Sequence, residues 1–155
     1  PCSGGTELSD EVKAVIENIK KAFPDMDAKK TAVGSTIYAV KPGDGSAREQ
    51  AASCQKVLGG WANIAKGYAT KRYRSNLINW GMLPFIYPED ELPFANDDYI
   101  FIPGIRKAIE DKLTDIPAYV VGEEMKPITL KMGELTDDER KIILAGCLIN
   151  YYKEA

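Results

Sequence analysis

The ten residues Lys-Pro-Gly-Asp-Gly-Ser-Ala-Arg-Glu-Gln, numbered 41–50, join two segments of different hydrophobic pattern. The apolar, β-branched run at 35–40 precedes them and is typical of a strand, whereas residues 51–58 have the pattern of a helix. Gly43 and Gly45 allow a tight turn at this junction, because glycine adopts positive φ without a steric penalty. The stretch therefore predicts a strand, a glycine turn and a helix in succession.

The predicted helix start has the features of an anion site. A helix N-terminus offers unpaired backbone N–H groups and a partial positive charge. Arg48 adds a planar guanidinium that suits a carboxylate, and Ser46 places a hydroxyl beside it. The alternative is structural, because Ser46 and Glu49 also have the spacing of a capping box. The doubled glycine favours the anion site, and so does a cation in the first turn, which the helix dipole disfavours unless an anion joins it.

Composition indicates a single globular domain. The chain has 155 residues, of which 45% are hydrophobic and 28% charged, and a net charge of −3. This balance disfavours a general nucleic-acid or membrane-surface binder, and no apolar run approaches the length of a membrane span. Cys2, Cys54 and Cys147 are too widely spaced to indicate a disulfide framework or a metal site, which predicts a cytoplasmic protein. The chain has no histidine, which excludes His-based triads and His metal ligands.

The N-terminal half predicts one amphipathic helix followed by a βαβ unit. The helix spans Ser9 to Phe23, with Ser9 as its cap and an apolar stripe at Val12, Val15, Ile16, Ile19 and Phe23. Residues 31–40 read as a strand, 51–58 as a helix that Gly59-Gly60 ends, and 61–65 as a second strand. Such a unit pairs its strands in parallel, so we expect Ser46 and Arg48 at the carboxyl edge of the sheet, where ligands bind.

The C-terminal half predicts further alternation of helices and strands. We expect a helix ending in a structured loop over 75–85, a surface loop at 88–98, a strand at 99–102, a helix at 104–113, and strands at 118–121 and 127–132 paired through 122–126. The last helix is predicted from Asp137 to the end, with a capping box at Thr136 and Glu139 and a buried stripe at Ile142, Ala145, Ile149 and Tyr152. The predicted fold class is an α/β single domain with a mixed sheet and packed helices.

The segment 66–74 is the best nucleic-acid candidate in the chain. It contains Lys66, Lys71, Arg72 and Arg74, with Tyr68 and Tyr73 between them. Basic residues interleaved with aromatic rings can bind single strands. Such runs are more often solvated faces, and they serve small anions equally well.

Four short motifs in order make the chain resemble the C-terminal swivelling domain of the aconitase family. They are Gly43-Asp44-Gly45-Ser46-Ala47-Arg48-Glu49, Leu58-Gly59-Gly60, Arg74-Ser75-Asn76-Leu77 and Gly81-Met82-Leu83-Pro84. The family's versions are close to G-x-G-S-S-R-E-H, Leu-Gly-Gly, R-[ST]-N-L and G-[IML]-L-P. The closing stretch from Ala145 to Glu154 is similar to the family's last helix. The resemblance covers the chain from about Thr31 to the C-terminus and implies a swivelling β/β/α-type domain.

The resemblance implies a hydro-lyase that interconverts citrate and isocitrate through aconitate. In the family, the first serine of the motif is the base at the carbon-bound proton, and the arginine binds a substrate carboxylate. These positions match Ser46 and Arg48, and Ala47 between them is a third substrate-binding position. A serine hydroxyl needs stabilisation of its anion to act as a base, and a nearby Arg and helix-terminal N–H groups provide it.

The family's [4Fe–4S] cluster is bound by cysteines of other domains, so the resemblance assigns no cluster ligand to this chain. The implied partners are a tricarboxylate or related hydroxy acid and the cluster-bearing domains of the same parent chain. No turnover is expected from this domain alone.

Three departures from the family pattern leave the exact hydroxy acid open. Ala47 replaces the second serine, Gln50 replaces the usual histidine, and the basic segment around 69–71 is one residue longer than usual.

Several alternatives remain at this point. The start at Pro1-Cys2, without Met, favours a fragment of a longer multidomain chain, with 1–8 as a connecting segment within a domain spanning 1–155. An isopropylmalate-type dehydratase carries the same domain as a separate small subunit, and that reading predicts a native start near Thr31. The other candidates are a non-catalytic anion- or RNA-binding module and a structural domain in which Ser46 only caps a helix.

Overall fold

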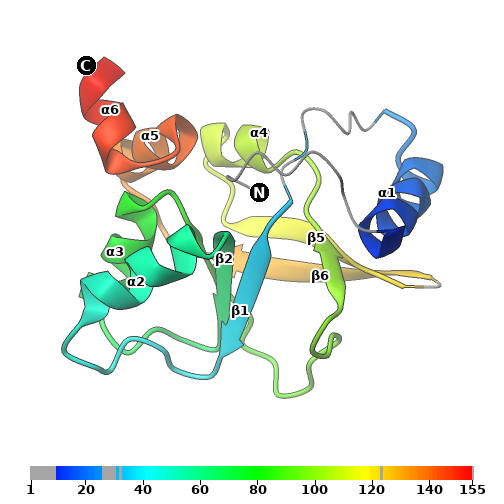
Figure 1. Ribbon diagram of the computed structural model, residues 1–155, viewed down its shortest axis with the longest axis horizontal. Helices are drawn as coiled ribbons and strands as arrows, with labels where there is room; N and C mark the ends of the chain where they lie inside the picture. Colours follow the sequence, from blue (N-terminus) through cyan, green and yellow to red (C-terminus); the bar gives the residue numbers. More distant parts are fainter. Residues whose placement is uncertain (1–9, 26–30, 32, 123, 155) are drawn as a thin grey trace.

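The computed structural model describes residues 10–25, 31, 33–122 and 124–154, and shows a mixed α/β fold (Figure 1). The strands of the sheet are β1 (Ser35–Ala39), β2 (Gly60–Ala65), β3 (Leu83–Ile86), β4 (Tyr99–Phe101), β5 (Asp115–Val121) and β6 (Met125–Met132). The helices are α1 (Asp10–Ala22), α2 (Arg48–Val57), α3 (Lys71–Asn79), α4 (Ile105–Glu110), α5 (Asp137–Ala145) and α6 (Leu148–Glu154). None of the described helices is long and apolar enough to cross a membrane.

The sheet confirms the predicted βαβ unit and the predicted hairpin. Its strand order is β1-β2-β3-β6-β5-β4, in which β1, β2 and β3 are parallel and the remaining neighbours are antiparallel. Because the first three strands run in the same direction, their carboxyl ends share one edge. Backbone hydrogen bonds join the loops there, from Gly67 N to Val40 O (3.3 Å) and from Ala69 N to Pro42 O (3.0 Å).

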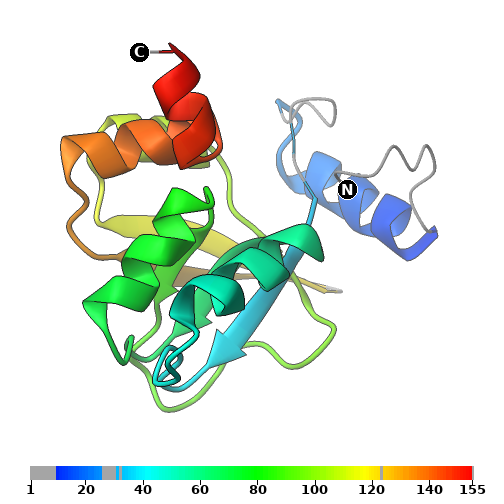
Figure 2. The ribbon, with the colours of Figure 1, turned by 60° about the vertical axis from the view of Figure 1, so that its left-hand side comes forward.

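The helices pack on two sides of β1. Helices α2 and α3 lie side by side, with α5 and α6 near them, whereas α1 lies on the other side of β1 (Figures 1 and 2). The main core contains the fully buried side chains of Ile64, Phe85, Ile116 and Leu130. Ile19 of α1 packs in a separate cluster on the β4–β5 side. The expectation of an α/β fold with a mixed sheet and packed helices is confirmed.

Two element boundaries differ from the prediction in the central segment. Helix α3 begins at Lys71, not near residue 75, because the Thr70 hydroxyl accepts a hydrogen bond from Tyr73 N and caps it. Strand β3 was predicted as a loop because it contains Pro84. Proline lacks an N–H, but β6 pairs only with Phe85 and Ile86, so the position of Pro84 needs no donor toward β6.

The predicted last helix is two helices. Gly146 adopts a left-handed conformation (φ 92°) that ends α5, and α6 starts at Leu148. The predicted buried stripe is therefore wrong beyond the break, since Ile149 is 62% and Tyr152 70% exposed. The capping box of Thr136 and Glu139 at the start of α5 is confirmed. The predicted cap of α1, Ser9, lies outside the described residues.

Candidate functional site

The glycine turn lies at the carboxyl end of β1, as predicted. Gly43 has φ +95°, a backbone conformation that L side chains rarely adopt. Ser46 and Ala47 are exposed, and Arg48 is the first residue of α2. The three predicted site residues therefore lie together at the start of one helix.

Ser46 does not cap α2. The N-cap position is Ala47, which has no oxygen in its side chain, and no side-chain hydrogen bond caps the helix. Glu49 does not complete a capping box either, because its Oε1 accepts a hydrogen bond from Trp80 Nε1 (3.3 Å). The capping interpretation of Ser46 is therefore wrong. The first-turn N–H groups of α2 and the Ser46 hydroxyl remain available to a ligand.

Arg48 is held by one nitrogen. Its Nε donates to the carbonyl oxygen of Gly43 (3.3 Å), and the Thr70 hydroxyl donates to the same oxygen (3.4 Å). The terminal guanidinium nitrogens of Arg48 make no hydrogen bond with another described residue. This arrangement fixes the start of the side chain and leaves the N–H groups that bind carboxylates in pairs free for a ligand.

A buried tyrosine lies directly beneath the turn. A Cβ placed on Gly43 would lie 2.5 Å from Cβ and Cγ of Tyr73, whose side chain is only 2% exposed. The Tyr73 hydroxyl accepts hydrogen bonds from Gln55 Nε2 on α2 and Asn63 Nδ2 on β2, both 3.1 Å long. In the sequence, Tyr73 stands out only as part of a basic run, and no local pattern predicts this contact. Thr70 was missed too, although a Thr before a helical segment is a recognisable N-cap.

The basic segment does not form a stacking surface. Lys66 pairs with Asp90, and Arg74 donates to the carbonyl oxygens of Gly133 and Glu134 (3.3 and 3.1 Å). The hydrogen bond between Lys66 and Asp90 raises the pKa of the lysine and lowers that of the aspartate.

The tyrosines of the segment point inward. The Tyr68 hydroxyl donates to the carbonyl oxygens of Asn63 and Phe85, and burial raises its pKa far above the usual value. With Tyr73 also buried, neither ring is free to stack on a base, which disfavours the RNA-binding alternative.

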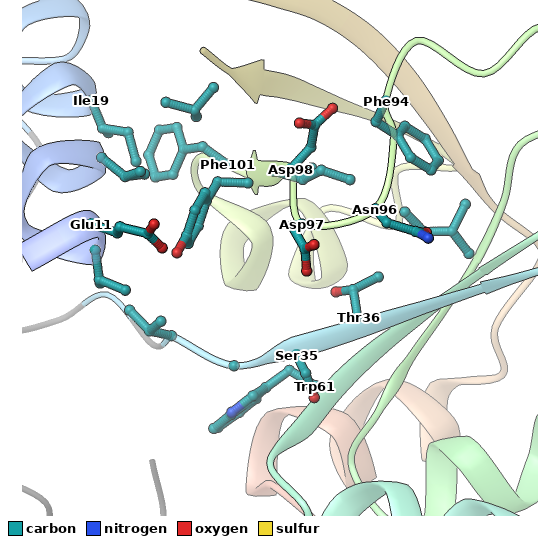
Figure 3. Close-up of a pocket in the computed structure, with 18 of the residues that line it drawn as sticks. Glu11, Ile19, Ser35, Thr36, Trp61, Phe94, Asn96, Asp97, Asp98 and Phe101 are labelled. Atoms are coloured by element: carbon teal, nitrogen blue, oxygen red, sulfur yellow. The ribbon is translucent and has the colours of Figure 1, made fainter. Parts of the chain in front are cut away.

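A large groove lies between α1, β1 and the loop before β4 (Figure 3). Its volume is about 1200 Å³, and its lining includes Glu11 of α1, Thr36 of β1 and Asp97 in the loop before β4. Neither Ser46 nor Arg48 lines it. Because Ser46 and Ala47 are exposed, a ligand bound at the glycine turn would be enclosed only if another polypeptide covered it.

No metal centre is found in the part of the chain that the structure describes. There, no three His, Cys, Asp or Glu side chains lie close enough to hold an ion. Iron–sulfur clusters are held by cysteine thiolates, and Cys54 and Cys147 form no such group with other residues. A cluster therefore does not fit these residues.

Comparisons with known proteins agree with the sequence resemblance. Residues 8–90 match the family model described as the aconitase C-terminal domain. The chain is 29% identical over 148 residues to aconitate hydratase A of Rickettsia bellii, covering 90% of this chain but only 16% of that protein. It is 35% identical over 137 residues to the methanogen homoaconitase small subunit of Methanocaldococcus jannaschii, covering 88% of this chain and 69% of that subunit.

One solved structure shows the same fold. The crystal structure of 3-isopropylmalate dehydratase from Methanocaldococcus jannaschii superposes with a TM-score of 0.52 at 30% identity, covering 96% of this chain and 80% of that chain. The match covers nearly the whole chain, so this relative shares the mixed α/β fold.

Proposed function

The chain belongs to the aconitase C-terminal domain family, and from that premise we propose that its glycine turn forms one wall of a hydro-lyase active site. The proposed reaction interconverts citrate and isocitrate through aconitate. Ser46 is the base at the carbon-bound proton, Arg48 binds a substrate carboxylate, and the Ala47 backbone N–H contributes to binding. The observation that supports this most directly is the Arg48 side chain, fixed by its Nε to Gly43 O while its terminal N–H groups stay free.

The chemistry of Ser46 follows from its surroundings. A serine alkoxide is too basic to persist in water, so the site must stabilise it. The Arg48 guanidinium and the uncapped N–H groups of α2 place positive potential beside the hydroxyl. In the dehydration direction, Ser46 Oγ takes the proton from the carbon, and the electron pair of the broken C–H bond forms the double bond. The C–O bond breaks with its electron pair on the hydroxyl, which takes a proton from an acid of the covering partner and leaves as water. Ser46 returns the proton in the reverse direction.

The remaining groups of the site come from a partner that covers the turn. A bound substrate at this open surface would stay in contact with water, which weakens the electrostatic stabilisation on which the base depends. We propose that the partner is the part of the enzyme that binds the [4Fe–4S] cluster, because the described residues of this chain offer no ligand set for it.

A second candidate is the small subunit of an isopropylmalate-type dehydratase. The chain is 35% identical to the homoaconitase small subunit and 29% identical to aconitate hydratase A, so of these two relatives the small subunit is the more similar in sequence. Ala47 also favours this candidate. Its exposed methyl group, where the family has a second hydroxyl, suits a substrate that is apolar at this position.

The test compares wild type with Ser46→Ala in the assembled, cluster-containing enzyme. Citrate, homocitrate and isopropylmalate are supplied in parallel. Loss of the base is expected to lower kcat by about 10²–10⁴-fold, the range for general acid–base groups. Ser53→Ala is the matched control, because Ser53 lies on the same helix and its hydroxyl bonds only Gln50 O. Full activity in Ser46→Ala would refute the proposal, and the substrate that turns over decides between the two candidates.

A further inference from the structure

Tyr73 connects four parts of the molecule around the glycine turn. Its Cβ, Cγ and Cδ1 atoms fill the space beneath Gly43, where an added Cβ would clash with them. Its hydroxyl bonds Gln55 of α2 and Asn63 of β2, while its backbone belongs to α3. Gln55 lies seven residues after Arg48, which places both on one side of α2. One side chain therefore touches the turn before Arg48 and fixes the helix that Arg48 begins.

The hydrogen bond between the Tyr73 hydroxyl and the Asn63 side chain is deeply buried. Asn63 is the buried polar residue of the described chain, at 1% exposure, and only Tyr73 bonds its side chain amide. Buried polar groups cost free energy unless they are paired, so an apolar side chain would serve packing better at this place. A hydrogen bond fixes the relative orientation of two side chains, whereas apolar side chains in contact can shift against each other. The contact therefore determines the position of the turn more closely than core stability requires.

We propose that Tyr73 is a positioning residue for the reaction, a role that rests on the proposed function of Ser46 and Arg48. Its ring supports Gly43, and its hydroxyl ties that ring to α2 and β2. The Gly43 carbonyl oxygen in turn holds Arg48 Nε. Tyr73 thus sets the place of the Arg48 guanidinium relative to Ser46 without touching the substrate.

The first test is Tyr73→Phe in the assembled enzyme, which keeps the ring under Gly43 and removes only the hydroxyl. Because small misplacements of reacting groups are costly, we expect kcat to fall about 10- to 100-fold, with KM changed less than about threefold. The pH profile of kcat should also shift to higher pH, because a displaced Arg48 places less positive potential beside the Ser46 hydroxyl. Tyr151→Phe is the control, since its hydroxyl contacts only Asp138 on α5.

A double variant separates positioning from stability. Tyr73→Phe removes the hydroxyl to which both the buried Asn63 Nδ2 and the part-buried Gln55 Nε2 donate, and Asn63→Leu in the same chain removes the more deeply buried of these two unpaired groups. We expect the double variant to regain most of the melting temperature that Tyr73→Phe loses, while kcat stays low. Recovery of kcat together with stability would show a merely structural role and overturn the inference.

A readout on the 155-residue chain needs no partner or cofactor. Amide hydrogen exchange at Ala51 and Ala69, whose N–H groups donate to Ala47 O and Pro42 O at the turn, should speed up about tenfold in the double variant, while exchange in the β5–β6 hairpin stays unchanged. Unchanged exchange at the turn would overturn the inference. If the proposed function is wrong, Ser46→Ala keeps full activity. If Ser46→Ala loses activity while Tyr73→Phe keeps the wild-type kcat, only the role of Tyr73 is refuted.

Discussion

Gly43 is the residue on which the geometry of the turn depends, and Gly43→Ala tests it. Its φ of +95° and the 2.5 Å approach to Tyr73 both exclude a side chain. Backbone strain of about 1–3 kcal/mol and overpacking of about 1–3 kcal/mol are expected to lower the free energy of unfolding by roughly 2–6 kcal/mol. Urea unfolding of the variant and wild type measures the difference.

Two other glycines serve as controls for this substitution. Gly59 has φ +89° but open space around it, so Gly59→Ala should show only the backbone cost of about 1–3 kcal/mol. Gly45 has neither a positive φ nor an atom within 4 Å of an added Cβ, so Gly45→Ala should stay within about 0.5 kcal/mol. Equal losses at all three positions would contradict the steric account of Gly43.

At the residue scale, the site residues of the turn were predictable from the sequence, whereas the packing of Tyr73 against Gly43 was not. Ser46, Ala47 and Arg48 are adjacent, so any strand–turn–helix reading brings them together. The contact of Gly43 with Tyr73 joins residues thirty positions apart in sequence (73 − 43), and it depends on how α3 docks against the turn. The capping box at Ser46 failed for a related reason, since Glu49 found Trp80 as a tertiary partner.

At the scale of single elements, the two S/T-x-x-E sequences make a matched pair. Thr136 and Glu139 form both bonds of a capping box on α5, whereas Ser46 forms none on α2. Thr136→Ala is therefore expected to cost about 1 kcal/mol of unfolding free energy, and Ser46→Ala close to zero. Chemical denaturation of both variants measures the costs. A loss of stability in Ser46→Ala similar to that in Thr136→Ala would restore the capping role.

The element boundaries show which local patterns the fold overrides. The apolar period of the C-terminal segment continues through Tyr152 and predicts one helix, but Gly146 ends it in the left-handed conformation. A tertiary contact accompanies this break. A Cβ on Gly81 would lie 1.7 Å from Gly146 O, so the turn before β3 packs directly on the α5–α6 junction. Gly146 itself was a recognisable helix terminator, whereas its neighbour Gly81 was not predictable from sequence spacing.

At the scale of the whole molecule, hydrophobic pattern was sufficient for the fold class and insufficient for the strand order. Alternation of helical and strand patterns predicts a mixed sheet. The pairing of β3 with β6, which joins the parallel half to the antiparallel half, rests on two residue pairs far apart in sequence. No local pattern specifies such a contact.

The open glycine turn leads to a prediction about assembly. Ser46 and Ala47 are exposed, so the described residues do not exclude water from the proposed site. Adding the cluster-bearing part of the enzyme should therefore slow amide hydrogen exchange at the carboxyl edge, over residues 43–48 and 66–71, by about tenfold or more. The hairpin turn around Gly122, which lies between the antiparallel strands β5 and β6, provides the internal comparison. Mass spectrometry of the chain with and without the partner measures both. Protection at the hairpin with none at the carboxyl edge would place the partner on another face, and Ser46 would then lack the dry surroundings that a serine base requires.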